Sequence, residues 1–157
     1  MIKKYWGLLF LIGLLYACDE SRVYEDTIVL KKAYWLADSI KTFDFTIDNN
    51  KDYYNLLLSL RNGREYPHYN IYINYAILDS TNQVLDEELR NFQLFDQKTG
   101  YPFGNGSGNL YEHQFELLTE YQFPYNGDYK IRYEQYMRYD SLPEVYSIGA
   151  RVERVVN

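Results

Sequence analysis

The chain has 157 residues, with 22 acidic against 16 basic side chains and a formal net charge of −6. Nucleic-acid binding rests on basic contacts to phosphate, so this balance argues against a nucleic-acid partner and against electrostatic adhesion to anionic lipid. The length suits one domain. The 19 tyrosines favour β-structure, because tyrosine is a strand former with an apolar ring and a polar tip.

The first eighteen residues have the pattern of an export signal. Lys3 and Lys4 precede an uncharged, mostly apolar run that ends at Ala17, directly before Cys18. This run is too short to cross a bilayer as a helix, which needs about 20 residues. Leu15-Tyr16-Ala17-Cys18 resembles the lipobox of bacterial lipoproteins, except that Tyr16 stands where a smaller residue is commoner. The alternatives are a chance cysteine at the end of a signal or a short membrane anchor.

Cys18 is the single cysteine of the chain, so no intramolecular disulfide and no cysteine-based zinc cluster can form. A glyceride on its thiol together with an N-acyl chain would give stable anchoring, because more than one hydrocarbon chain is then buried. We therefore expect three parts: a signal peptide over 1–17, a lipidated N-terminus and flexible tether over 18–26, and a β-sandwich domain over 27–157.

The first half of the mature chain contains four strand-like segments. Thr27–Leu36 reads as a strand or as a segment packed over one end of the core, with Trp35 as a core anchor. Thr42–Ile47 alternates apolar and polar residues, as a half-buried strand does. Tyr53–Arg61 is more continuously apolar and is interpreted as a central strand because turn formers bound it. Tyr69–Leu78 alternates most clearly of all.

The second half continues this pattern. Val84–Phe95 is expected to form a strand, and residues 96–109, with four of the nine glycines, form the longest stretch without periodicity. Leu110–Phe123 fits one extended strand, although part of it could also pass as a helical turn or two. Asn126-Gly127 is a turn signal. Two more strands are expected over Tyr129–Met137 and Val145–Val156.

About eight strands without a convincing long helix predict an all-β protein, a single antiparallel β-sandwich after the signal peptide. Jelly-roll-like and immunoglobulin-like connectivity both fit this pattern.

No motif indicates catalysis or a cofactor. His68 and His113 have no second histidine at ligand spacing, and the DxDxDG calcium pattern is missing. Ser107 lies outside any GxSxG motif, and the glycines of 96–109 match no phosphate-binding fingerprint. We expect a non-enzymatic protein whose only bound group is the covalent lipid on Cys18, with no metal and no small-molecule ligand.

One charged and aromatic stretch is a candidate docking face, which comprises Arg132, Glu134, Tyr136 and Arg138. Arginine and tyrosine often carry binding energy at interfaces. The alternative is a solvated strand face with cross-strand ion pairs.

In order and spacing, a set of short segments over essentially the whole mature chain resembles the GldH lipoproteins of gliding Bacteroidetes. These segments are the lipobox, Trp35, Phe43-Asp44-Phe45, Leu60-Arg61-Asn62, Tyr66-Pro67-His68-Tyr69-Asn70, Gly100, Gly104-Asn105-Gly106, Gly127-Asp128-Tyr129, Glu134 to Arg138, Leu142 and Ile148-Gly149. The resemblance departs at Pro102-Phe103, where a tryptophan-like aromatic is expected.

The resemblance implies a lipid-anchored, non-enzymatic envelope protein required for gliding, a motility coupled to type IX secretion. Its expected partners are the membrane and other gliding or secretion proteins. Its expected place is the periplasmic side or the cell surface, with the outer membrane favoured over the inner. The competing hypothesis is an aromatic-rich module that binds glycan or peptide, since aromatic faces stack on sugar rings.

Overall fold

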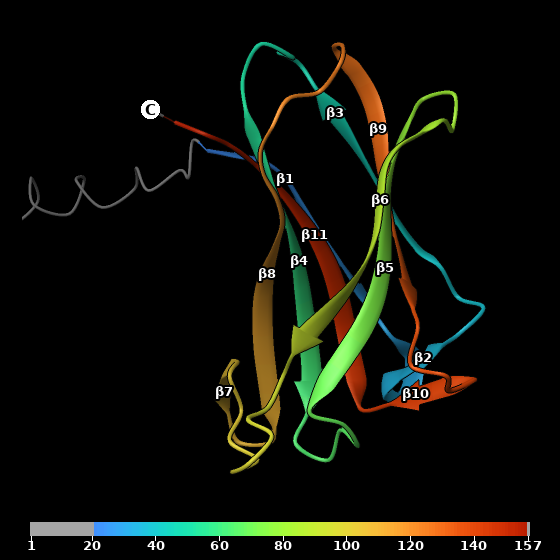
Figure 1. Ribbon diagram of the computed structural model, residues 1–157, viewed down its shortest axis with the longest axis vertical. Helices are drawn as coiled ribbons and strands as arrows, with labels where there is room; N and C mark the ends of the chain where they lie inside the picture. The colour runs from blue at the N-terminus through green and yellow to red at the C-terminus, as the bar shows by residue number, and fades with distance from the viewer. Residues whose placement is uncertain (1–20, 157) are drawn as a thin grey trace, which may run out of the picture.

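The computed structural model describes residues 21–156, and it is a β-sandwich without an α-helix in that range (Figure 1). The all-β antiparallel sandwich predicted from the sequence is confirmed. The signal segment and Cys18 lie outside the described residues. Between Ser21 and Val156, no helix has the length and apolar character needed to cross a membrane.

Two antiparallel sheets form the sandwich. The first has the order β1 (Arg22–Val29), β11 (Val145–Arg154), β4 (Tyr54–Gly63), β8 (Leu110–Tyr121) and β7 (Asn105–Ser107). The second has the order β3 (Lys41–Ile47), β9 (Gly127–Gln135), β5 (Asn70–Asp79) and β6 (Val84–Gln93). A small third sheet pairs β2 (Tyr34–Leu36) with β10 (Ser141–Pro143).

The pairing of the eight long strands is nested. The outermost strands β1 and β11 pair, as do β3 and β9, β4 and β8, and finally β5 and β6 at the centre. A long hairpin rolled up in this way places successive strands alternately in the two sheets, except for the central pair β5 and β6, which share one sheet; this is the connectivity of a jelly roll. The choice that the sequence left open between jelly-roll-like and immunoglobulin-like connectivity is thereby decided.

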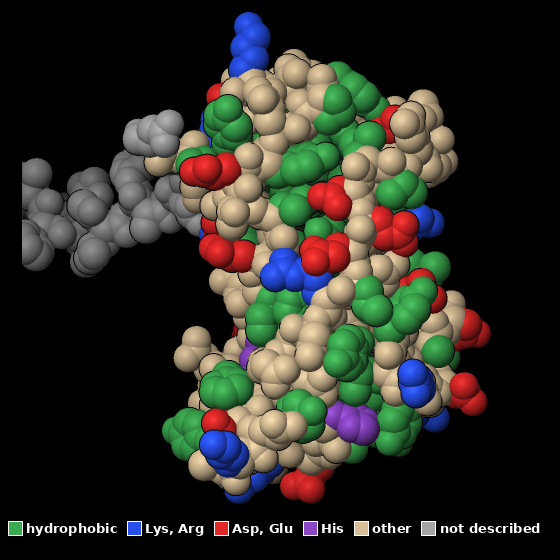
Figure 2. Space-filling model, in the orientation of Figure 1, with side chains coloured by type: hydrophobic (Ala, Val, Ile, Leu, Met, Phe, Trp, Pro, Cys, Tyr) green, Lys and Arg blue, Asp and Glu red, His purple; other side chains and the backbone are tan. Residues whose placement is uncertain are grey.

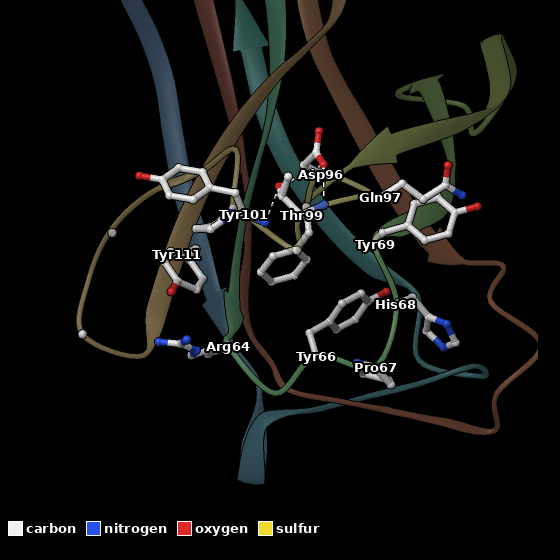
Figure 3. Close-up of a pocket in the computed structure, with 15 residues that line it drawn as sticks. Arg64, Tyr66, Pro67, His68, Tyr69, Asp96, Gln97, Thr99, Tyr101 and Tyr111 are labelled. Carbon is white, nitrogen blue, oxygen red and sulfur yellow. Dashed lines mark hydrogen bonds between the residues drawn. The ribbon is translucent and has the colours of Figure 1, made fainter.

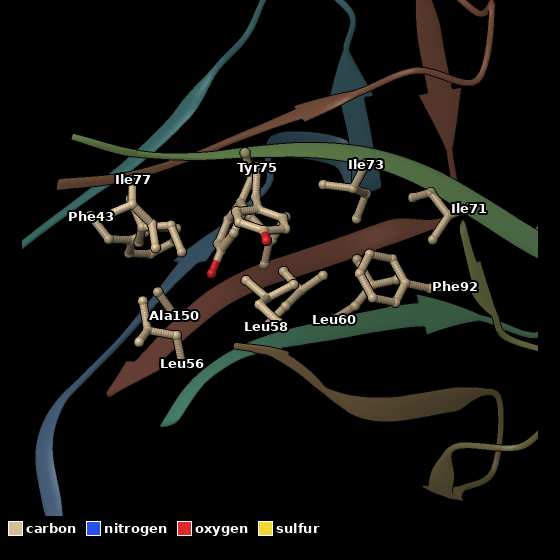
Figure 4. Packing of buried hydrophobic residues seen from close by; sticks show 14 of the residues in the cluster. Phe43, Leu56, Leu58, Leu60, Ile71, Ile73, Tyr75, Ile77, Phe92 and Ala150 are labelled. Carbon is tan, nitrogen blue, oxygen red and sulfur yellow. The ribbon is translucent and has the colours of Figure 1, made fainter. Parts of the chain in front are cut away.

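The core lies between β4 and β5, which face one another across the sandwich (Figure 4). On β4 the inward residues Leu56, Leu58 and Leu60 are almost completely buried. The inward residues of β5 pack against them, and all are nearly inaccessible to solvent: Ile71, Ile73, Tyr75 and Ile77. The interpretation of the apolar run 53–61 as a central strand is therefore correct, because β4 lies between β11 and β8.

The small sheet covers one end of this core. Trp35 on β2 lies opposite Leu142 on β10, and both side chains are fully buried. The indole Nε1 donates a hydrogen bond of 3.0 Å to the carbonyl of Ser39, so the one polar atom of the ring is satisfied. Trp35 is thus the core anchor that the sequence predicted.

The N-terminal part of the domain differs from the prediction. The expected segment Thr27–Leu36 is divided into β1, a 3₁₀ turn over Lys31–Ala33 and β2. The turn is made by two left-handed residues, Lys32 at φ 57° and Ala33 at φ 56°. The tether also needs a correction, because β1 begins at Arg22, inside the stretch expected to be flexible. Main-chain hydrogen bonds to β11 hold the start of β1, and the hydropathy of residues 22–26 gives no sign of this pairing.

The seam where β6, the edge strand of the second sheet, meets β8 of the first sheet is polar. On its outer side β8 is flanked only by the three-residue strand β7. In β6 the inward positions opposite Ile77, Tyr75 and Ile73 are taken by Asp86, Glu88 and Arg90. Charged side chains that point inward at an edge strand discourage pairing with other chains. Figure 2 shows acidic and basic side chains gathered midway along this face of the molecule.

The chain enters and leaves the sandwich at the same end. The amide of Arg154 donates to the carbonyl of Ser21, and Arg154 is paired with Tyr54 at the start of β4. Gly63 closes β4 at the opposite end, roughly 30 Å away at about 3.3 Å per residue. Figure 1 shows the loops next to β7 at this far end, away from the C-terminus.

Candidate functional site

An open hollow of about 670 Å³ lies at the end of the sandwich away from Ser21. Three segments form it: the loop that follows β4, the loop between β6 and β7, and the β7–β8 hairpin. We call it the loop-end hollow (Figure 3). It is lined by Arg64, Tyr66, Pro67, His68, Tyr69, Phe95, Asp96, Gln97, Thr99, Gly100, Tyr101, Pro102, Gly106, Gly108 and Tyr111.

The lining is aromatic and polar. Four tyrosines, one phenylalanine, two prolines and three glycines are joined by charged or hydrogen-bonding side chains, and the set includes no alanine, valine, leucine, isoleucine or methionine. In Figure 3 Arg64, Tyr101 and Tyr111 lie on one side, Tyr69 and Gln97 on the other, and Tyr66 between them. The hollow can therefore offer ring faces and hydrogen bonds, but no aliphatic pocket.

Asp96 fixes the loop that carries Tyr101. Its Oδ1 accepts hydrogen bonds from the amides of Lys98 and Thr99, at 2.9 and 2.7 Å, and from the Thr99 hydroxyl at 2.9 Å. These bonds, first the one from the Thr99 amide, lower the pKa of Asp96 and keep the carboxylate ionised. The amide of Asp96 donates to the carbonyl of Tyr101 at 2.7 Å, which closes the loop.

The tyrosines differ in how freely they are presented. Tyr101 is 73% exposed and Tyr69 is 41% exposed, so both rings are open to solvent. Tyr111 packs edge-on against Phe95 with ring centroids 5.9 Å apart. Tyr66 is buried, its hydroxyl donates to the carbonyl of Asn70, and burial raises its pKa. Tyr66 and Phe95 are therefore buried, whereas the rings of Tyr69 and Tyr101 are available to a ligand.

Arg64 supplies the positive charge of the hollow. Its backbone amide donates to the carbonyl of Asn109 at 2.9 Å, which fixes the base of the side chain. Within residues 21–156 no carboxylate lies at ion-pair distance from its guanidinium. His68, by contrast, is held edge-on between the rings of Tyr66 and Tyr139, at 5.8 and 5.1 Å.

The docking face is divided between a strand and a loop. Arg132 and Glu134 lie half-buried on the outer face of β9, whereas Tyr136 and Arg138 are exposed and follow it. The alternation had extended this strand through Met137, but it ends at Gln135, and Arg138 adopts a left-handed φ of 59°. Two shallow hollows of about 70 and 390 Å³ adjoin the four residues and share Glu134.

Hydrogen bonds across the sheet position Tyr136. Its amide donates to the carbonyl of Tyr72 at 2.8 Å, and the amide of Tyr72 in turn points at the sulfur of Met137 at 3.1 Å. The Tyr136 ring remains 49% exposed. The backbone is therefore fixed while the aromatic side chain is left for contact.

The two histidines do not form a common site. His113 lies on β8, buried and stacked on Phe115 with ring centroids 5.6 Å apart, and burial lowers its pKa to about 4. Its Nε2 has no hydrogen-bond partner among the described residues. No group of three His, Cys, Asp or Glu side chains in residues 21–156 could hold a metal ion.

The sequence pattern alone does not predict the loop-end hollow. The local signal was present, since residues 64–69 and 96–111 are rich in tyrosine, glycine and proline. Whether these loops meet depends on β4 and β8 being paired and on β5 leading into the facing sheet, which is a property of the whole topology.

The fold and these surfaces define a jelly-roll β-sandwich domain with an aromatic loop-end hollow and an exposed aromatic and charged face. The GldH lipoprotein family matches residues 22–152, and the chain belongs to this family. The resemblance inferred from the sequence is confirmed, and membership places the protein among membrane-anchored lipoproteins of the cell envelope.

Two relatives cover nearly the whole chain. The gliding motility lipoprotein GldH of Flavobacterium johnsoniae is 27% identical over 160 residues, 98% of each chain. A GldH homolog of Christiangramia forsetii is 25% identical over 156 residues, 95% of this chain and 94% of the relative.

Solved structures resemble the chain only in broad architecture. A carbohydrate-binding module of family CBM28, specific for non-crystalline cellulose, has a TM-score of 0.46 at 10% identity and covers 84% of this chain and 73% of its own. The VP2 subviral particle of infectious bursal disease virus has a TM-score of 0.43 at 13% identity, over 87% of this chain and 34% of VP2.

Proposed function

We propose that this protein is a non-enzymatic interaction component of the gliding and type IX secretion machinery, held at the membrane by a lipid on Cys18. The observation that carries the proposal is the match to the GldH lipoprotein family over residues 22–152. The gliding role named for the relatives in Flavobacterium and Christiangramia is extended here to this chain.

The arrangement of the domain supports a role in contact. The chain enters the sandwich at Arg22, so only a few residues separate Cys18 from a folded strand. The lipid would therefore hold one end of the jelly roll near the membrane and leave the other end, with its loops, facing away. Neighbouring envelope proteins would meet a rigid, oriented domain.

The docking face is the surface we assign to a protein partner. Tyr136 and Arg138 are both exposed, and tyrosine and arginine are residue types that often dominate binding energy. Glu134 and Arg132 beside them provide charges of both signs, which favours a specific register of docking over general adhesion.

Paired substitutions test this assignment. Tyr136→Ala with Arg138→Ala is expected to abolish colony spreading while the protein accumulates normally, because both side chains are exposed and leave the fold intact. Tyr53→Ala with Lys98→Ala is the matched control, since Tyr53 is also 49% exposed and lies elsewhere. Normal spreading and adhesin secretion with the first pair of substitutions would show that the docking face is not required for gliding. Normal spreading and adhesin secretion after deletion of the gene would contradict the gliding role itself.

A further inference from the structure

We propose that the loop-end hollow binds an acidic saccharide, with sugar rings on Tyr101 and Tyr69 and the sugar's carboxylate on Arg64. This departs from the expectation that no small-molecule ligand is bound, and it gives the competing glycan hypothesis a defined place. The proposal stands apart from the docking face, which is formed by other residues.

The exposed rings are held ready for stacking. Tyr101 is 73% exposed although its loop is fixed by Asp96, so its exposure does not arise from a loosely attached segment. The carbonyl of Tyr69 accepts the amides of Leu94 and Phe95, at 2.8 and 2.9 Å, which fixes the second ring's backbone. A pyranose has apolar C–H faces and polar edges, and it can place a face on each ring without reorganising the loops.

The charges orient the ligand. Arg64 has no carboxylate partner among residues 21–156, and a guanidinium binds a carboxylate through two parallel hydrogen bonds. In Figure 3 Gln97 lies on the side of Tyr69, opposite Arg64, and Asp96 lies between the two sides, above Thr99. An anionic group is therefore favoured at Arg64, whereas sugar hydroxyls can donate to the Asp96 carboxylate and bond with the Gln97 amide.

The lining favours a saccharide over a peptide that inserts side chains or adds a strand. Such peptides need apolar pockets for their side chains or an open strand edge for main-chain pairing. Apart from two proline rings, the loop-end hollow has no aliphatic lining side chain. Gly100 and Gly108 face open space, whereas Gly106 lets the backbone of Leu110 and the ring of Tyr111 approach closely. A volume of about 670 Å³ lies within the range of small-ligand sites.

The hollow also lies where an extracytoplasmic polysaccharide could reach it. It is about 30 Å from the end at which the chain enters the sandwich, measured along the ten residues of β4. A domain anchored through its N-terminus would present this end away from its own membrane.

Calorimetry on the purified full-length lipoprotein in detergent micelles tests the proposal with defined probes. Trigalacturonate is the acidic saccharide, α-1,4-galactotriose its neutral counterpart, tetraglutamate the acidic peptide, and inorganic phosphate the simple anion. We expect trigalacturonate to bind with a Kd of about 1 mM or tighter and the other three to bind at least about 10-fold more weakly.

Variants assign the binding to the hollow. Arg64→Ala and Tyr101→Ala should each weaken trigalacturonate binding by about 10-fold or more, whereas Arg64→Lys should retain part of it. Tyr53→Ala, at the other end of the sandwich, should leave it unchanged, and circular dichroism confirms that each variant is folded. The proposal is overturned if no saccharide binds, if tetraglutamate or phosphate binds as tightly, or if the Arg64 and Tyr101 variants bind like the parent protein.

Discussion

Trp35 closes one end of the core. It is completely buried, and it is fixed by Leu142 opposite and by the Ser39 carbonyl. Trp35→Ala should therefore lower the free energy of unfolding by about 3–5 kcal/mol, the range for large aromatic truncations. Its neighbour Tyr34 is 47% exposed, and Tyr34→Ala should cost less than about 1 kcal/mol. Urea denaturation of both variants checks this, and equal midpoints would contradict it.

His113 makes stability depend on pH. Burial lowers its folded-state pKa to about 4, whereas an unfolded histidine titrates near 6.5. Between these values the unfolded chain binds more protons, so stability is lost as the pH falls from about 6.5 toward 4. From pH 7.5 to pH 5 this group should remove about 2 kcal/mol.

His113→Gln provides the comparison, because glutamine does not titrate. Urea midpoints of both proteins across this pH range separate the histidine contribution from that of the carboxylates, which the two proteins share. A His113→Gln protein with the same pH dependence as the parent would show that His113 is not the group responsible.

Arg90 on β6 joins this strand to β8 of the other sheet. Its Nη1 donates to the carbonyls of Glu116 and Leu117, at 2.9 and 2.8 Å, and its guanidinium lies 5.5 Å from the ring of Phe92. Beside it, burial raises the pKa of Tyr75 to about 12, with a further contribution from Asp86 and Glu88. A single cation thus satisfies two β8 carbonyls and lies 4.0 Å from the carboxylate of Glu88 on β6.

Replacing Arg90 should open this seam. Arg90→Ala is expected to cost about 1.5–3 kcal/mol, the range for hydrogen bonds to charged groups, and to speed hydrogen exchange in β6 and β8. Arg61→Ala is the control, because Arg61 pairs with Glu112 on the exposed surface at 3.2 Å and should matter by at most about 1 kcal/mol. If exchange in β6 and β8 were unchanged by Arg90→Ala, the seam would depend on packing alone.

A strand can be predicted from the sequence where its own residue pattern determines it, and cannot where distant parts of the chain determine it. The alternation of Phe43, Phe45 and Ile47 records one buried face, and it predicted β3 almost to the residue. The start of β1 at Arg22 could not be predicted, because Arg22 pairs with Glu153 of β11, far along the chain. Val23, Tyr24 and Ile28 of this strand also pack against the core, but their spacing shows no alternation. β9 ends shortly before a left-handed turn at Arg138, and arginine has no preference for that conformation from which the turn could be predicted.

The molecule as a whole is a rolled hairpin whose two ends have different surroundings. Both described termini lie at one end, and the loop-end hollow lies at the other. The sequence predicted the sandwich and the family but not the hollow, since segments 64–69 and 94–111 meet only once the sheets face each other. The proposed function therefore depends on the chain being attached at the end where it enters the sandwich.

Attachment through Cys18 is tested most directly in a gliding bacterium that carries Cys18→Ala in place of the parent gene. We expect a folded domain that leaves the membrane fraction and colonies that no longer spread. Supplying the same domain with residues 1–18 from an unrelated lipoprotein should restore both, because any lipid anchor at this end suffices. Spreading that persists with the unanchored Cys18→Ala protein would contradict the claim that tethering this jelly roll to the membrane is what its function requires.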